Sequence, residues 1–228
     1  MADGDDLKRA AAEHAAQLVH SGMALGLGTG STATFFVEAV GRLVASGMTL
    51  RALATSDHTA RLARAAGIEV LEDIQAPLDL AVDGADEIGP GMSLIKGRGG
   101  ALFREKLVAA SARRFMVIAD EGKVVPRLGL GVLLPVEVLP FLWGRTAERL
   151  ADLGGSWQLR GGEDRPYITD NGNLIVDMKF EDGIGDPAAL GAAIKAITGV
   201  VEHGLFVDLT TGCIVAGVGG IRVLGSID

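Results

Sequence analysis

Apolar and polar positions recur with two different spacings in the first half of the chain. Short apolar runs, typical of buried strands, alternate with longer segments whose apolar residues recur at helical spacing. The pattern predicts strands at 23–27, 50–54, 68–71, 78–82 and 115–119, and helices at 7–19 (capped by Asp6), 31–45, 57–66 and 101–113. Strands and helices that alternate in this way are typical of a mostly parallel sheet covered by helices on both faces.

The pattern changes near residue 129. Beyond it we expect strands at 132–139 (interrupted by Pro135), 156–160, 174–180 and 200–206, with helices at 144–153 and 187–197. This strand–helix–strand–strand–helix–strand order is that of a ferredoxin-like unit. Two short strands at 213–216 and 221–224 are expected to return to the first sheet.

The predicted fold class is therefore α/β, with two domains. Residues 1–129 and 207–228 are expected to form a Rossmann-like catalytic domain. Residues 130–206 are expected to form a smaller inserted α+β domain that serves oligomerisation.

Composition narrows the function classes. The chain has 228 residues and a formal net charge of −8, which argues against a nucleic-acid partner because such proteins carry a basic face. A single cysteine, Cys213, excludes an internal disulfide and is expected to be inert core. The first residues lack the layout of a signal peptide, and the most apolar stretch, 128–143, is too short and too interrupted to span a membrane. We expect a cytoplasmic protein with no membrane partner.

A glycine-rich loop, 26–32, follows the first strand and opens a helix. Backbone N–H groups and the positive end of the helix dipole favour phosphate at such a place, and Thr29, Ser31 and Thr32 add hydroxyl donors. The alternative is a tight turn in which Ser31 only caps its helix. The glycine spacing matches neither a dinucleotide fingerprint nor a Walker loop.

Acidic residues gather after the strand 78–82. Asp83 ends the strand and Asp86 follows three residues later, so one turn can point both carboxylates into a crevice. Close carboxylates raise each other's proton affinity, which suits proton transfer near neutral pH. Turn capping by the two aspartates is one alternative, and a magnesium site is a minor one.

Two lysines and one glutamate complete the candidates. Lys96 opens the glycine-rich segment 97–100 and could neutralise a developing oxyanion, or it could be an ordinary exposed lysine. Lys123 follows the strand 115–119 and could reach the same crevice. Periodicity alone favours a solvated helix charge for Glu105.

In this order, these pieces resemble the A class of ribose-5-phosphate isomerases over nearly the whole chain. The sequence strings that carry the resemblance are Gly28-Thr29-Gly30-Ser31-Thr32, Thr55-Ser56-Asp57, Val82-Asp83-Gly84-Ala85-Asp86-Glu87, Ile95-Lys96-Gly97, Arg104-Glu105-Lys106, Leu134-Pro135-Val136-Glu137-Val138 and Thr169-Asp170-Asn171-Gly172-Asn173.

The resemblance implies reversible interconversion of ribose 5-phosphate and ribulose 5-phosphate in the pentose phosphate pathway, without metal or organic cofactor. It implies Glu105 as the base, Lys96 as stabiliser of the oxyanion, and Asp83 and Asp86 as carriers of hydroxyl protons and agents of ring opening. The predicted substrate-binding residues are Thr29, Gly30, Ser31, Thr32, Asp83, Gly84, Ala85, Asp86, Lys96, Gly97, Arg98, Gly99 and Lys123. A homodimer or homotetramer is also implied.

One residue departs from the family pattern, and two other functions stay open. Arg98 stands where a glycine is expected, which questions the backbone freedom of its loop. The first alternative function is a non-enzymatic sugar-phosphate sensor domain. The second is a CoA-transferase-like enzyme that uses a glutamate as nucleophile.

Overall fold

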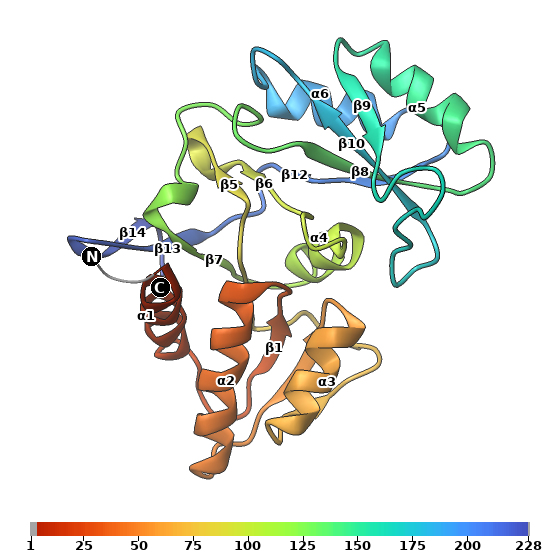
Figure 1. The fold of residues 1–228 in the computed structure, drawn as a ribbon. Helices are drawn as coiled ribbons and strands as arrows, with labels where there is room; N and C mark the ends of the chain where they lie inside the picture. The colour runs from red at the N-terminus through yellow and green to blue at the C-terminus, as the bar shows by residue number, and fades with distance from the viewer. Residues whose placement is uncertain (1–3, 228) are drawn as a thin grey trace. The chain divides into compact units, whose positions relative to one another are not determined.

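The structure is a computed structural model that describes residues 4–227. Its chain divides into two compact units (Figure 1). Unit 1 comprises Met1–Ala85, Arg104–Lys123 and Leu209–Asp228, and unit 2 comprises Asp86–Phe103 and Val124–Asp208. The segments 86–103, 124–129 and 207–208, which the sequence expectation gave to the first domain, thus group with unit 2.

Unit 1 is built on a seven-stranded sheet in the order β14-β13-β7-β4-β1-β2-β3. Its strands are parallel except for β14 at the edge, which pairs antiparallel with β13. This confirms the predicted α/β class and the return of the last two strands. The bounds are β1 (Ala24–Leu27), β2 (Arg51–Ala54), β3 (Glu69–Val70), β4 (Leu80–Asp83), β7 (Phe115–Asp120), β13 (Gly212–Gly217) and β14 (Gly220–Gly225).

Helices cover both faces of this sheet because side chains alternate along each strand. In β1, Leu25 and Leu27 join the core formed with α1 (Gly4–Ala16) and α2 (Ser31–Ala45). Gly26, between them, faces α4 (Leu102–Ala110), where an added Cβ would lie 2.5 Å from Cγ1 of Val108. The helix predicted at 31–45 is observed with these same bounds, as α2. The first helix already includes Gly4, so Asp6 lies inside its first turn and the predicted cap is wrong.

Unit 2 contains the predicted ferredoxin-like order. Its four-stranded antiparallel sheet, β11-β8-β10-β9, consists of β8 (Leu134–Val138), β9 (Ser156–Leu159), β10 (Leu174–Lys179) and β11 (Val200–His203). The connecting helices are α5 (Trp143–Ala151) and α6 (Pro187–Lys195). Both helices contribute buried residues to one core with this sheet.

A second, three-stranded sheet in unit 2 has no counterpart in the sequence prediction. It consists of β5 (Glu87–Ile88), β6 (Leu94–Ile95) and β12 (Leu205–Phe206). The single strand predicted at 200–206 is therefore wrong, because Gly204 divides it between two sheets. A Cβ on Gly204 would lie 2.3 Å from the carbonyl oxygen of Lys96, so only glycine allows this close crossing.

The remaining elements are short. They are α3 (Asp57–Ala65), η1 (Pro90–Met92) and η2 (Glu121–Lys123). Among the described residues, no helix has the length and apolarity needed to cross a membrane.

Candidate active site

Three neighbouring parallel strands of unit 1 end at one edge of the sheet. In the order β7-β4-β1, each is followed by a segment that carries predicted site residues. The glycine loop follows β1, Asp83 ends β4, and Lys123 lies in η2 directly after β7. The carboxyl ends of parallel strands are the usual place for a ligand in an open α/β sheet.

Asp83 links two of these segments and is only 3 % exposed. Its Oδ1 accepts hydrogen bonds from the backbone N–H of Thr29 at 3.1 Å and of Gly84 at 2.7 Å. A Cβ on Gly28 would lie 2.1 Å from the same Oδ1 atom, so the close approach requires glycine. Asp83 therefore fixes the shape of the glycine loop, in addition to any part in proton transfer.

The hydroxyl of Thr29 belongs to a cluster of hydroxyl groups that sequence reasoning did not assign. Its Oγ1 lies 2.7 Å from Oγ1 of Thr55, 2.8 Å from Oγ of Ser56 and 3.1 Å from Oγ1 of Thr59. Thr59 donates in turn to the carbonyl oxygen of Gly28 at 3.0 Å. The structure thus gives Thr29 a role in holding the loop, and its contact with substrate stays a prediction.

The N-terminus of α2 is capped by Gly30, with φ 116° and ψ 176°, and no described side chain accepts from its first turn. The alternative in which Ser31 only caps the helix is therefore wrong, because Ser31 is the first helical residue. Ser31 is exposed and Thr32 is half-buried. This helix end keeps its positive dipole and backbone donors for an anion.

Glu105 lies on α4 and is 4 % exposed. The interpretation of Glu105 as a solvated helix charge is therefore wrong. Burial of a carboxylate is costly unless polar contacts compensate it, so Glu105 cannot be treated as an ordinary surface charge. Periodicity missed it because the apolar spacing of α4 does not show which of its polar side chains other segments of the chain cover, whereas Leu107 of the same helix stays exposed.

Unit 2 carries the second group of predicted residues. Lys96 is 2 % exposed, and its Nζ lies 5.5 Å from the ring centroid of Phe206, within cation–π range. Its interpretation as an ordinary exposed lysine is wrong. Asp86 accepts a hydrogen bond at Oδ2 from the N–H of Arg98 at 2.9 Å.

Arg98 fits its loop without strain. Gly97 and Gly100 have φ values of 103° and 85°, in the left-handed region that favours glycine. Arg98 is not among the described residues with positive φ, so a side chain is tolerated there. Sequence reasoning also missed Arg160 and Tyr167, which contact the carbonyls of this loop from far along the chain.

Glu137 connects two of the sequence strings that carried the resemblance. It is fully buried, and its Oε1 accepts from Oγ1 of Thr169 at 3.0 Å, Nδ2 of Asn171 at 3.1 Å and Nδ2 of Asn173 at 2.8 Å. The turn before β10 is thereby tied to β8. These strings serve the architecture of unit 2.

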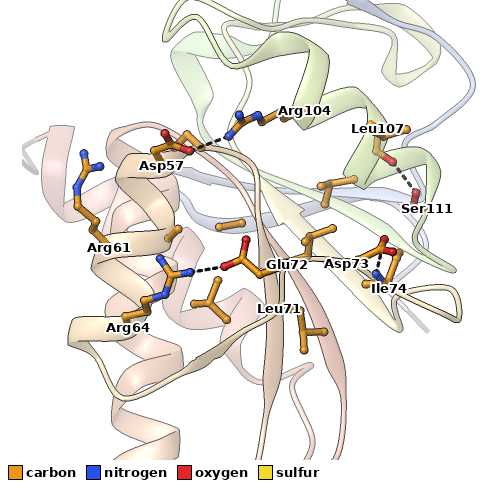
Figure 2. A pocket seen from close by; sticks show the side chains of 16 residues that line it. Asp57, Arg61, Arg64, Leu71, Glu72, Asp73, Ile74, Arg104, Leu107 and Ser111 are labelled. Carbon is orange, nitrogen blue, oxygen red and sulfur yellow. Dashed lines mark hydrogen bonds and ion pairs between the residues drawn. The ribbon is translucent and has the colours of Figure 1, made fainter. Parts of the chain in front are cut away.

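A hollow of about 780 Å³ lies in unit 1 between α3, α4 and the chain after β3 (Figure 2). Its walls carry three arginines and three acids, and two of the arginines are paired: Arg64 with Glu72 and Arg104 with Asp57, at 2.8 Å each. None of the predicted site residues lines it. With its charges balanced, this hollow offers little attraction for a phosphate.

Two further observations concern chemistry. Within residues 4–227, no group of three or more His, Cys, Asp or Glu side chains is placed to hold a metal ion. Cys213 is fully buried, and burial raises the pKa of its thiol to about 12, which confirms it as inert core.

Comparison with known proteins gives consistent matches. The family model described as ribose 5-phosphate isomerase A (phosphoriboisomerase A) matches residues 51–220. Ribose-5-phosphate isomerase A of Caulobacter vibrioides is 53% identical over 213 residues, which cover 90% of this chain and 91% of the relative. The structure of ribose 5-phosphate isomerase from Plasmodium falciparum superposes with a TM-score of 0.93 at 37% identity, covering 98% of this chain and all of that one. A D-ribose-5-phosphate isomerase in complex with phospho-erythronic acid also gives 0.93, at 36% identity, covering 99% of this chain and all of that one.

Proposed function

The chain belongs to the ribose 5-phosphate isomerase A family, and from this membership we propose that it interconverts D-ribose 5-phosphate and D-ribulose 5-phosphate. It is an aldose–ketose isomerase, an intramolecular oxidoreductase. In this reaction a proton moves between C2 and C1 while hydroxyl protons move between the two oxygens. No electrons leave the substrate, so proton carriers and charge stabilisation are sufficient and no cofactor is required. Neither the sensor domain nor the CoA transferase is favoured by these matches.

Glu105, the buried glutamate of α4, is the proposed base of the reaction. We assign to Glu105 the removal of the C2 proton from the open-chain aldose and its return to C1. The electron pair left behind forms an enediolate, whose negative oxygen Lys96 stabilises. Asp83 and Asp86 take up and return hydroxyl protons and open the sugar ring.

The phosphate group needs donors, and unit 1 supplies them at the N-terminus of α2. Gly30, Ser31 and Thr32 offer backbone N–H groups and two hydroxyls in the open first turn. Lys123 adds a positive charge. The other predicted contacts with substrate, as stated from the sequence, are Thr29, Gly84, Ala85, Gly97, Arg98 and Gly99.

Assembly and location complete the proposal. The protein acts as a homodimer or homotetramer in the cytoplasm, with unit 2 as the source of the oligomer contacts. Exposed apolar side chains at 139, 141 and 142 of unit 2 support such contacts. A single buried thiol suits a reducing compartment.

The experiment is an isomerase assay on ribose 5-phosphate with EDTA present, on wild type, Glu105→Gln and Glu38→Gln. Glu105→Gln keeps the shape of the side chain but removes its basicity, so kcat should fall about 10²- to 10⁴-fold. Exchange of solvent deuterium into C2 of the substrate should fall in parallel. Glu38, an exposed glutamate on α2, provides the matched control and should leave kcat unchanged.

A phosphorylated sugar acid separates binding from catalysis. Phospho-erythronic acid carries a phosphate and a carboxylate, so it should inhibit wild type and bind Glu105→Gln in calorimetry. Wild type without isomerase activity would refute the reaction. Near-normal turnover in Glu105→Gln would transfer the role of base to another carboxylate.

A further inference from the structure

The Lys96 loop, residues 96–100, is held from one side by two distant side chains of unit 2. Nη1 of Arg160 donates to the carbonyl oxygens of residues 97 and 98, at 3.0 Å each. The hydroxyl of Tyr167 donates to the carbonyl oxygen of residue 99 at 3.3 Å. Three successive carbonyls of the loop therefore turn toward these two side chains.

Arg160 is itself held in place by Asp177. Its Nε donates to Oδ2 of Asp177 at 2.9 Å, and its Nη2 donates to Oδ1. The two side chains are 18 % and 8 % exposed, so solvent screens the pair only weakly. The planar guanidinium thus bridges a fixed carboxylate and two loop carbonyls, a geometry that a lysine ammonium cannot reproduce.

The same contacts decide where the loop N–H groups point. Because a peptide is planar and trans, a carbonyl directed at Arg160 sends the N–H of the next residue the opposite way. The N–H of Arg98 reaches Asp86 in this manner, at 2.9 Å. The N–H of Gly100 closes the turn onto the carbonyl of Gly97 at 3.0 Å. The N–H of Gly99 makes no hydrogen bond to any residue of the described chain, so it is left available to a ligand oxygen.

We propose that Arg160, oriented by Asp177 and assisted by Tyr167, is a positioning residue for the isomerase reaction. It does not touch substrate; it fixes the Lys96 loop, and with it the direction of the Lys96 side chain and of the Gly99 N–H. The inference rests on the proposed function, because the chemical role of the loop comes from there. Catalytic groups that lose their alignment by about 1 Å can lose 10²-fold in rate, so loosening this loop should be costly.

The test compares Arg160→Met and Arg160→Lys with wild type at saturating ribose 5-phosphate. Both variants should lose roughly 10- to 100-fold in kcat, while KM changes less than about threefold, because the phosphate donors belong to another segment. Arg145→Met is the matched control: Arg145 is an exposed arginine of the same unit, paired with Glu148, and its loss should leave both constants unchanged. Tyr167→Phe removes one contact only and should lower kcat by a few-fold.

A second measurement separates positioning from folding. Arg160→Met leaves the buried carboxylate of Asp177 without its cation, which can destabilise the fold. The double variant Arg160→Met/Asp177→Leu buries no unpaired charge. Its kcat should be as low as that of Arg160→Met. Hydrogen exchange of the amides of Arg98 and Gly100, whose N–H groups are hydrogen-bonded, should accelerate in both, with the exchange of β8 and β10 unchanged.

The outcomes of this test distinguish the two proposals. Wild type without activity refutes the proposed function together with this inference. Active wild type with Arg160 variants of unchanged kcat, or of unchanged exchange at the Arg98 and Gly100 amides, refutes only the positioning role.

Discussion

Gly28→Ala should collapse the junction between the glycine loop and β4. The added Cβ would lie 2.1 Å from both Cγ and Oδ1 of Asp83 and 2.6 Å from its Cα. The Asp83 carboxylate is close to rigid, because it accepts two backbone N–H bonds and is almost fully buried. Either the loop moves away or the carboxylate leaves its partners.

The expected cost follows from these contacts. Overpacking of this kind costs about 1–3 kcal/mol, and each lost hydrogen bond to a charged group costs about 1.5–3 kcal/mol. Because partial relaxation recovers some of both, we expect a loss of about 3 kcal/mol or more in the free energy of unfolding. For a chain of this length, Tm should then fall by roughly 6–12 °C.

Thermal unfolding followed by far-UV circular dichroism, with kcat/KM measured beside it, tests the prediction. The control is Gly144→Ala on α5, where an added Cβ meets nothing within 4 Å and where helix propensity favours alanine. Gly144→Ala should therefore match wild type or slightly exceed its stability. If Gly28→Ala keeps both the Tm and the kcat/KM of wild type, then Asp83 does not hold the glycine loop.

Three further predictions address the phosphate donors, a buried network and the free thiol. Ser31→Ala and Thr32→Ala should each raise KM for the sugar phosphate by a factor equivalent to about 1–3 kcal/mol. The control Ser46→Ala, at the other end of α2, should leave KM unchanged. If KM and inhibition by phosphate are both unchanged in the first two variants, the loop is not the phosphate site. Glu137→Ala removes the acceptor of three hydrogen bonds from the turn before β10, and urea unfolding should show a loss of roughly 3 kcal/mol or more. Burial raises the pKa of the Cys213 thiol to about 12, so the stability it contributes is present below the ordinary pKa of 9.0 and is lost as pH rises toward 12. Between pH 8 and pH 10, wild type should therefore lose about 1.4 kcal/mol more than Cys213→Ala in urea unfolding, and equal losses would contradict the shift.

The success of sequence reasoning varied with the length of the element. The helix 31–45 was predicted with its observed bounds, because a long apolar face and flanking glycines mark both of its ends. The strands β5 and β6 have two residues each, too few for any periodicity to show. The division of 200–206 depends on the crossing of Gly204 over Lys96, a contact between segments more than a hundred residues apart.

The burial of individual side chains was harder to predict from the sequence than the helices and strands that carry them. Glu105 and Lys96 look like ordinary charges of a helix and a loop, and only the packing of other segments around them makes them buried. The proposed function depends on this difference, since an exposed glutamate or lysine has neither the fixed geometry nor the water exclusion that proton abstraction requires.

Arg160 shows most clearly what the sequence alone does not predict. It lies 17 residues from Asp177 and 63 from Gly97 in the sequence, and no short motif relates the three. They come together because β9 and β10 pair in a register that sets Gln158 opposite Asp177. This register brings the end of β9, and with it Arg160, beside the carboxylate of Asp177. The segment before α4 lies next to the same side chain, so the carbonyl of Gly97 can accept from Arg160. Register is decided by the burial of one face of the sheet, so it is a property of the whole sheet rather than of local sequence. The residues that would do the chemistry can therefore be proposed from local strings, whereas the residue that orients them becomes visible only after the strands are paired.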